Sequence, residues 1–512
     1  MDSLRLLAPE LVLSALALGL LAADLLIPAA GPGAARRPRL IYHLAWLSIL
    51  ISLGCIAYGM GHGDSLQSVG KLWVVDPLSQ FFKAAVLIST VLCLMMTLEY
   101  KQLPASQSGT FCALMVFSAV GMMFLISSID LLLVFVALEL VSVSSFILAG
   151  FERRNRKSNE GSMKYFLFGA FSSALMVYGI SLYYGATGTT RLMELSQSPT
   201  SFTLWTPALA SAGARGPAFL LGMLFILLGF GFKAAMVPMH FWVPDAYEGA
   251  PMPVAAYLSV APKIATMGVI LRVFMLLVPA STLELTGLFA LLAILTMTVG
   301  NTIAIFQDNV KRLLAYSAIA QAGYILIGVV CGNELGLEGV LLYSAIYVLM
   351  NIGAFAAVQA VGDNGSNAGL GSYELAAFDG LGQRSLVMAL TLTVFLLSLA
   401  GLPPLAGFIG KFYVFAAAMD AGRSAAAGTG AGPGVYYALA VAGVLNSVIS
   451  VYYYMRIVYH MFFRPAGPDA QKISAGPFLW GCLALCLAGI LIFGVYPEPI
   501  IAHVKLSAAH LP

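Results

Sequence analysis

Charged side chains inside apolar segments are the part of this sequence best suited to chemistry. Glu139 is the one carboxylate at the centre of such a segment, which reads LLLVFVALELVSVSSFIL, and Lys233, Lys263 and Lys411 are the deepest of six basic residues in apolar segments. A charge at mid-bilayer depth is costly, so each of these side chains is a functional candidate by default. One buried acid and three buried lysines together suggest a proton path.

Two roles are open to Glu139, depending on its partner. A carboxylate buried alone takes up a proton, because burial disfavours its charged form, whereas a nearby lysine holds it ionised. Ser142, Ser144 and Ser145 make one flank of the same segment polar. We expect a role in proton transfer; the alternative is a fixed ion pair between helices that takes no part in transport.

Two of the lysines lie beside predicted helix breaks. Lys233 is followed by Pro238, and Lys411 is preceded by Pro403 and Pro404. Proline interrupts a helix, and irregular backbone inside a membrane is tolerated only within protein or beside a water-filled cavity. Paired, interrupted segments that carry charge are typical of ion sites in transporters. We therefore expect both lysines to be functional, with extension of the side chain to the membrane surface as the alternative.

The other four basic residues divide by depth. Lys263 follows Pro262 and lies far from both ends of its apolar segment, so we also expect it to be functional. Lys83, Arg272 and Arg456 lie nearer segment ends, and long basic side chains can extend along apolar surface to reach water. We expect these three to reach the interface and to take no part in transport.

A loop rich in proline, aromatic and acidic residues, MVPMHFWVPDAYEGAPMP, follows Lys233. His240 in this loop could pass protons near neutral pH, or it could cap a helix end, and both readings stay open. Asp245 and Glu248 are expected to fix the turn. Polar residues in two later segments could hold water between the lysines, although each alone is more often an interhelical hydrogen-bonding group. They are Tyr316, Ser317, Gln321, Tyr324, Tyr343, Ser344, Tyr347 and Asn351.

Composition identifies a polytopic membrane protein. Of 512 residues 60% are hydrophobic and only 10% are charged, with a mean hydropathy of +0.91; soluble domains carry about 25% charged residues. A net charge of +3 does not suggest nucleic-acid binding. The six cysteines form no CxxC pair, no cluster has metal-ligand spacing, and no GxGxxG or P-loop motif occurs. We expect no cofactor and no metal in this chain.

Fourteen apolar segments reach the length of about 20 residues that a membrane-spanning helix needs. The fold class is therefore all-α, in one membrane domain over residues 1–512. The segments begin near Leu4, Leu40, Leu78, Thr110, Asp130, Lys164, Ala218, Met252, Leu283, Leu313, Glu338, Ser385, Val435 and Pro477. Lys and Arg are more than twice as frequent in the odd-numbered loops as in the even loops and termini, which predicts that both termini face away from the cytoplasm.

The order of the segments suggests an internal duplication. Segments four to eight (residues 110–277) and nine to thirteen (283–462) would form two inverted five-helix repeats, each with a discontinuous fourth helix, the seventh and twelfth of the chain. Residues 1–109 would precede the repeats, and 476–512 would follow. In the first repeat the proline follows the lysine, whereas in the second it precedes the lysine. Segment order thus supports the repeat, but residue-level similarity does not demonstrate it.

Several motifs together resemble the antiporter-like membrane subunits of respiratory complex I. They are FKAAMVPMHFWVPDAYEGAP, APKIA, KRLLAYSAIAQAGY, GLPPLAGFIGKFYVF and the glutamate of ALELVS. The chain is most similar to the subunit N branch of bacterial NADH-quinone oxidoreductase. Tyr247 stands where subunits L and M usually have histidine, and Lys411 stands where subunit M has glutamate. The chain also ends soon after the fourteenth segment, without the long lateral helix of subunit L.

The resemblance implies a mechanism and a setting. Electrons would pass from NADH through FMN and iron-sulfur clusters to quinone in partner subunits. Glu139 would pair with Lys233, and moving the two apart would release the lysine proton to Lys263, then to Lys411 and outward. The implied partners are the neighbouring subunit M and the small subunits J and K, in the bacterial inner membrane, with both termini periplasmic.

Three other classes remain. A multisubunit cation/proton antiporter shares this fold and these lysines, although PDAYEGAP argues against it. A membrane scaffold without transport would have no need for Glu139, Lys233 and Lys411 together. A membrane-bound hydrogenase module is a minor alternative.

Overall fold

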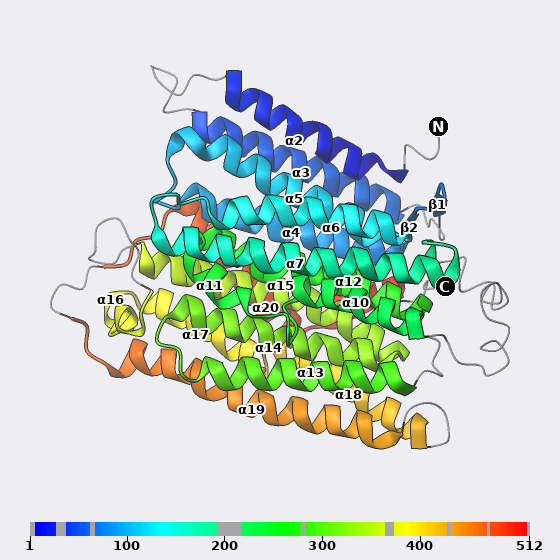
Figure 1. Ribbon diagram of the computed structural model, residues 1–512. Coiled ribbons are helices and arrows are strands. Elements are labelled where there is room, and N and C mark those ends of the chain that lie inside the picture. The colour runs from blue at the N-terminus through cyan, green and yellow to red at the C-terminus, as the bar shows by residue number, and fades with distance from the viewer. Residues whose placement is uncertain are drawn as a thin grey trace.

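The structure, a computed structural model, describes residues 6–26, 37–61, 67–192, 217–277, 283–363, 373–426, 432–467 and 472–508. It is a bundle of long, roughly parallel and antiparallel helices (Figure 1). The long helices are α2 (Ala8–Leu26), α3 (Arg37–Gly61), α4 (Pro77–Leu98), α5 (Ser108–Ser127), α6 (Leu131–Ala149), α7 (Arg156–Thr187), α10 (Pro217–Ala234), α12 (Met252–Leu277), α13 (Leu283–Ala304), α14 (Val310–Cys331), α15 (Glu334–Gly362), α17 (Leu386–Ala400), α18 (Ala406–Ala426), α19 (Pro433–Phe463) and α20 (Pro477–Val495).

Short elements connect the long helices. They are α11 (Trp242–Gly249), α16 (Leu381–Arg384), α21 (Glu498–Ala508) and the 3-10 turns η1 (Ala105–Gln107) and η3 (Leu375–Phe378). A hairpin of β1 (Gln67–Val69) and β2 (Trp73–Val75) pairs antiparallel before α4. Sequence analysis did not predict this hairpin. Its loop has three residues, of which Gly70 and Lys71 have positive φ, and the Leu72 amide donates to the Val69 carbonyl at 3.1 Å.

The all-α membrane fold is confirmed, and a helix coincides with each of the fourteen expected segments. Twelve of the described helices are long and apolar enough to cross a membrane, and Ala218–Ala234 and Leu386–Ala400 are shorter apolar helices. These two belong to the segments in which proline predicted a break. The exact number of membrane crossings and the inverted repeat stay predictions.

Both breaks turn the chain sharply. After α10, Ala235 takes a positive φ of 63°, and after α17, Gly401 has a φ of 86°. The Val237–Pro238 and Pro403–Pro404 peptide bonds are cis. The chain resumes as α11 in the first case and as α18 in the second, so each broken segment leaves free helix ends inside the bundle.

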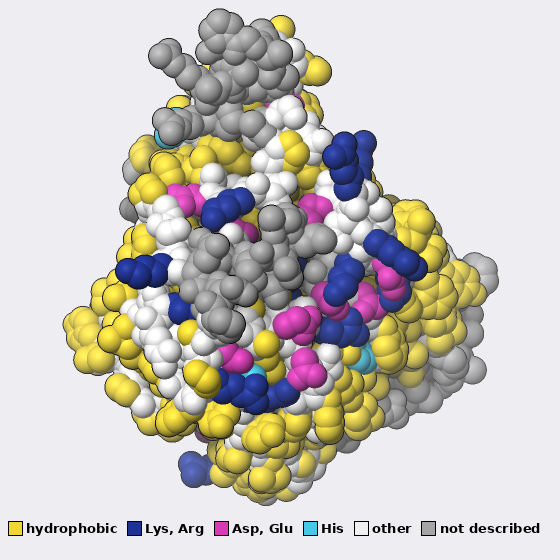
Figure 2. Space-filling model, turned by 90° about the vertical axis from the view of Figure 1, so that its left-hand side faces the viewer, with side chains coloured by type: hydrophobic (Ala, Val, Ile, Leu, Met, Phe, Trp, Pro, Cys, Tyr) yellow, Lys and Arg dark blue, Asp and Glu magenta, His cyan; other side chains and the backbone are white. Residues whose placement is uncertain are grey.

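Three helices form the centre of the bundle. The apolar stretches of α12, α14 and α15 are almost entirely buried, whereas those of α2, α19 and α20 are mostly not. The outward faces carry large apolar side chains, such as Val136 on α6 and Val448 on α19. Broad apolar outer surfaces of this kind are suited to lipid. Charged side chains gather instead at the end of the bundle that carries α16 (Figure 2).

Two of the six basic residues lie elsewhere than predicted. Lys83 and Arg272 are each only 1% exposed and do not reach the interface. Lys83 Nζ lies 2.5 Å from Glu10 Oε1, and the Arg272 guanidinium donates two 2.9 Å hydrogen bonds to Asp76. The prediction was wrong because position within one segment does not reveal which side chain of another helix lies opposite.

These pairs also show that Glu139, which is half-buried, is not the only acid inside the bundle. Glu10, at the start of α2, is fully buried. Arg456 fits its expected place at a helix end: it donates to the Ile305 and Gln307 carbonyls and pairs with Asp308, which is largely exposed.

Candidate functional site

Lys233 lies in the last turn of α10 and is 1% exposed. Its ammonium donates to Ser142 Oγ on α6 at 3.1 Å and to the Tyr165 hydroxyl on α7 at 3.0 Å. It also lies 5.4 Å from the centre of the Tyr165 ring. That ring stacks on Trp242 of α11, with centroids 4.0 Å apart. Three helices and the first break therefore hold this lysine in a fixed position.

Glu139 is half-buried on α6, one turn before Ser142. Its Oε1 accepts a 2.5 Å hydrogen bond from Ser173 Oγ on α7. No ion pair joins it to Lys233, although the structure describes both residues; Lys233 instead contacts Ser142 on the same helix. The base, on α10, therefore contacts α6 one helical turn away from the acid.

Lys263 is buried at the centre of α12, which continues as a helix through Pro262. Its Nζ donates to the Ala318 carbonyl of α14 at 2.7 Å. The ring of Tyr247, from α11, lies 5.7 Å from the ammonium. Lys263 thus lies between α11, just after the first break, and the polar helix α14.

Lys411 lies in the first half of α18 and is 3% exposed. Its Nζ donates to the carbonyl of Ala400, the last residue of α17, at 3.0 Å. The Tyr324 ring centre is 4.3 Å from the ammonium. A Cβ on Gly401 would approach Lys411 Cδ to 2.7 Å, so the second break leaves room for this lysine only because residue 401 is glycine.

A hydrogen-bonded group of side chains lies next to the backbone carbonyls that Lys263 and Lys411 contact. Ser317, next to the Ala318 carbonyl that Lys263 contacts, bonds the Tyr454 hydroxyl at 2.5 Å. Gln321 donates to Tyr454 at 3.4 Å and to the Leu399 carbonyl at 3.1 Å. Leu399 directly precedes Ala400, the acceptor for Lys411.

Other predicted polar residues join this region from α15. Tyr343 donates a hydrogen bond to Gln321. Tyr347 and Asn351 contact Ser259 of α12, one turn before Lys263, at 3.0 and 2.6 Å. Tyr324 accepts from Asn301 at 3.1 Å. Among the described residues Ser344 is buried without a hydrogen-bond partner, and Tyr316 is half-buried.

His240 lies in the loop after α10 and is 5% exposed. Burial lowers its pKa, although a backbone hydrogen bond with Pro238 acts in the opposite direction. Its Nδ1 has no hydrogen-bond partner in the part of the chain that the structure describes, and its carbonyl accepts from the Val243 amide at the start of α11. Burial therefore favours the neutral ring of His240 at the start of α11. The choice between a proton-passing role and a helix-capping role stays open.

Asp245 and Glu248 fix the position of α11, as expected from the sequence. Asp245 pairs with Lys164 at 2.7 Å and with Arg312 at 2.5 Å, while Glu248 pairs with Lys157 at 2.7 Å and with Arg312 at 3.0 Å. Burial alone would raise the pKa of each acid, but the hydrogen bonds from these basic groups outweigh it and lower the pKa of both. This cluster ties α11 to α7 and α14.

Three residues at the site were missed by sequence analysis: Tyr165, Ser173 and Tyr454. Each lies in a helix whose sequence has several similar residues, such as YYYMR around Tyr454. Side-chain type alone does not show which of them faces inward. In the part of the chain that the structure describes, no group of His, Cys, Asp or Glu could hold a metal, and the six cysteines are free.

Comparisons with known proteins agree on one family. Residues 128–434 match the family model described as "NADH:quinone oxidoreductase/Mrp antiporter, TM". NADH-quinone oxidoreductase subunit N of Trichlorobacter lovleyi is 39% identical, over 98% of this chain and 96% of the relative. The protein of the same name from Moorella thermoacetica is also 39% identical, over 99% of both chains.

The fold has a solved counterpart. A chain of respiratory complex I from Thermus thermophilus superposes with a TM-score of 0.77 and 29% identity, covering 96% of this chain and 98% of that one. All four predicted charged residues, Glu139, Lys233, Lys263 and Lys411, lie within the stretch that the family model matches.

Proposed function

This chain belongs to the NADH:quinone oxidoreductase/Mrp antiporter family of membrane subunits, as a subunit N homologue of respiratory complex I, and from that premise we propose that it conducts protons along Glu139, Lys233, Lys263 and Lys411. Electron transfer from NADH to quinone takes place in partner subunits. The chain itself contributes transport and no redox chemistry.

The hydrogen-bonded group near Lys263 and Lys411 is the observation that carries this proposal. Ser317 and Gln321 both hydrogen-bond to Tyr454, close to the carbonyls that the two lysines contact, and each of the three side chains can both donate and accept a hydrogen bond. Buried polar groups in a membrane otherwise cost free energy, which makes a transport role the physical reason for so many of them. The lysines supply the sites that gain and lose the proton, and the hydroxyl and amide groups supply the steps between them.

Glu139 acts in this proposal as the group that sets the charge of Lys233. A carboxylate close to the ammonium favours the protonated lysine, and its withdrawal favours proton release. Lys233 contacts Ser142, one helical turn from Glu139 on α6, and Ser173 of α7 donates a hydrogen bond to the carboxylate. A small shift of α6 against α7 would therefore exchange a serine contact for an ion pair. This is the step at which redox energy from the partner subunits would enter.

The partners of the chain and its location are proposed from the same family. We propose contacts with subunit M and with the small subunits J and K, and a bacterial inner-membrane location with both termini periplasmic. NADH, FMN, iron-sulfur clusters and quinone would bind only in partner subunits. Residues 110–277 and 283–462 would form the two half-channels, with Lys233 in the first and Lys411 in the second.

Replacing Glu139 or Lys233 with Ala tests these roles. Proton uptake by inverted membrane vesicles and NADH:quinone reductase activity would be measured together, with assembly of the complex checked on a native gel. We expect proton uptake per NADH to fall for both variants. Exposed Arg154→Ala is the control, because it removes a charge without touching the site. Unchanged pumping in an assembled complex carrying either site variant contradicts the assigned roles.

A cation/proton antiporter is the second candidate, because the matching family model is described for Mrp antiporters as well. That function requires proton movement driven by a sodium gradient without NADH. Purification with NADH- and quinone-binding subunits, and no sodium-driven proton movement, would exclude it.

A further inference from the structure

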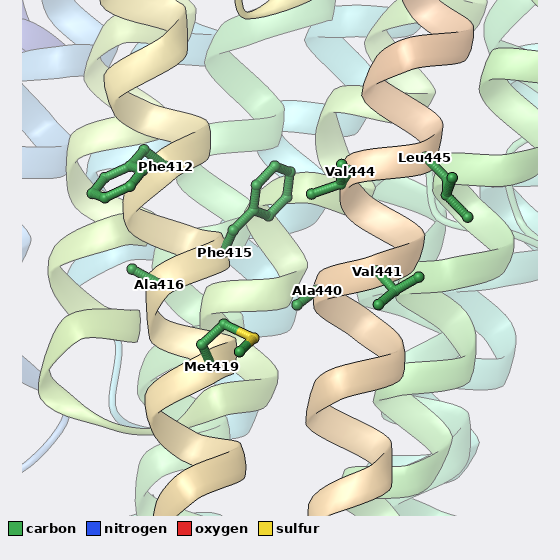
Figure 3. A pocket seen from close by; sticks show the side chains of 8 residues that line it. All are labelled: Phe412, Phe415, Ala416, Met419, Ala440, Val441, Val444 and Leu445. Carbon is green, nitrogen blue, oxygen red and sulfur yellow. The ribbon is translucent and has the colours of Figure 1, made fainter.

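An apolar groove lies on the outer face of the bundle between α18 and α19. It has a volume of about 410 Å³ and is lined by side chains that include Phe412, Phe415, Met419, Val441 and Val444. Phe415 and Val444 point toward one another across the gap between the helices (Figure 3). Phe412 and Val441 are 57% and 58% exposed, so the groove opens outward.

A basic side chain lies just beyond one end of this groove. Arg423 lies one helical turn beyond Met419 on the same face of α18, in the last turn of that helix. It is exposed, and within the described residues it has no hydrogen-bond or ion-pair partner. The groove and the neighbouring guanidinium together offer a ligand both an apolar surface and a positive charge.

The dimensions fit one leaflet of a bilayer. Phe412 and Arg423 are separated by a helical rise of about 16 Å, and half of the hydrocarbon core is about 15 Å thick. A basic residue at a helix end is also well placed to extend to the headgroup region. The groove and Arg423 together therefore have about the length of one leaflet.

We propose that this groove is a phospholipid site, in which Arg423 binds the phosphate and one acyl chain lies along Phe412, Met419, Val441 and Val444. Guanidinium binds phosphate through two parallel hydrogen bonds, which gives both strength and orientation. The acyl chain covers the exposed aromatic and aliphatic side chains of α18 and α19 that line the groove. Either an anionic or a zwitterionic headgroup supplies the phosphate, and net negative charge strengthens the contact.

The inner wall of the groove connects it to Lys411. Phe415 packs edge-on against Tyr324, with ring centroids 6.3 Å apart, and Tyr324 lies over the Lys411 ammonium. Gly443 of α19 leaves room for the Phe415 ring, since a Cβ there would approach it to 2.4 Å. An acyl chain in the groove thus holds Phe415 against Tyr324. This connection rests on the proposed role of Lys411, whereas the lipid site itself does not.

The lipid site is tested in the intact complex in native-lipid nanodiscs. A photoactivatable phosphatidylglycerol with its reactive group in the acyl chain is the probe, and a matched diacylglycerol without phosphate is the second probe. Cross-links are mapped by peptide mass spectrometry. We expect phosphatidylglycerol to label the peptides around Met419 and Val441, with much weaker labelling by diacylglycerol.

Variants separate the two halves of the site. Arg423→Ala should lower phosphatidylglycerol labelling about fivefold, and Arg423→Lys should lower it less, because it retains the charge. Val444→Trp fills the groove and should remove the labelling. Val448→Trp, one turn further along α19 and 65% exposed, is the matched control and should leave it unchanged.

Other outcomes would overturn the lipid site. Equal labelling by the two probes, or labelling that neither Arg423→Ala nor Val444→Trp changes, indicates ordinary contact with bulk lipid. No labelling together with cross-links to a neighbouring subunit identifies a protein helix as the occupant. Proton pumping by Val444→Trp is measured separately: unchanged pumping with lost labelling contradicts only the connection to Lys411.

Discussion

Lys233 and Lys411 each lie at the carboxyl end of a broken helix, but they reach it from opposite directions along the chain. Lys233 belongs to the helix that ends, since it lies in the last turn of α10. Lys411 belongs to the helix that follows, and contacts the final carbonyl of α17 across the break. Helix carboxyl ends carry free carbonyls and a partial negative charge, which stabilises a cation. Each break therefore provides a binding position for a lysine.

The two positions differ in what else surrounds the ammonium. Lys233 donates to two hydroxyl groups, and the helix that supplies Ser142 also carries Glu139 one turn away. Lys411 donates to one backbone carbonyl, with Tyr324 beside it, and no described carboxylate forms an ion pair with it. A carboxylate on a neighbouring helix can move, whereas a helix-end carbonyl is fixed. The first position is thus suited to switching, and the second to passing on a proton.

Replacing each lysine should give the largest effects. We expect Lys233→Ala and Lys411→Ala each to lower proton pumping about a hundredfold, the lower range for removing a positioned proton-transfer group. Arginine at either position keeps the charge but does not release a proton at neutral pH. Both Arg variants should therefore fail to pump, as measured by proton uptake in vesicles. Pumping restored by Lys411→Arg alone would mean that the second position needs only a charge.

The two breaks should respond differently to a single methyl group. Gly401→Ala should lower pumping about tenfold, because its Cβ meets Lys411 and a left-handed φ costs alanine about 1–2 kcal/mol. Ala235→Gly removes a methyl group at the first break and should leave pumping unchanged. Both are measured in assembled complexes with equal quinone reductase content. Normal pumping by Gly401→Ala would show that the Lys411 contact with α17 is dispensable.

The helices, the two breaks and the burial of the lysines could be predicted from the sequence, because apolar length and proline positions are local signals. A helix lies at every expected segment, both breaks occur where proline indicated them, and the three deepest lysines are buried. The buried pairs of Lys83 with Glu10 and of Arg272 with Asp76 were missed. They depend on the register between distant helices, which one sequence does not reveal.

The hydrogen-bonded side chains near Lys263 and Lys411 could also be predicted only in part from one sequence. Ser317, Gln321 and Tyr343 were identified as candidates from their depth in apolar segments, and all three join the group. Tyr454 was not identified, although it contacts two of its members. Three consecutive tyrosines precede Met455, and only the packing of α19 against α14 distinguishes the one that faces Ser317.

Tyr454 provides an intermediate test of the connection between the two positions. Tyr454→Phe removes the hydroxyl between Ser317 and Gln321 and should lower pumping about fivefold, the equivalent of one hydrogen bond worth about 1 kcal/mol. Tyr453→Phe is the comparison variant: its hydroxyl donates to Asn301 at 2.9 Å and also lies beside Ser317 and Tyr454, but it does not contact Gln321 in the described structure, so its effect should be smaller. Equal effects of the two variants on vesicle proton uptake would argue against a route through Tyr454.

The smallest effect is expected from Ser142→Ala. Lys233 loses one hydrogen bond but keeps its contact with the Tyr165 hydroxyl at 3.0 Å. Assembly and pumping should therefore fall less than twofold, which is less than the loss of one complete hydrogen bond would cause. Ser142 nonetheless lies one helical turn from Glu139 on α6, and its removal takes away the hydroxyl that Lys233 contacts on that helix. The variant should therefore draw the pair together, retain the proton on Lys233 longer, and slow pumping more at neutral pH than at alkaline pH, where release of the proton is easier. A pH profile of proton uptake that matches the unsubstituted complex would mean that Ser142 does not separate the pair.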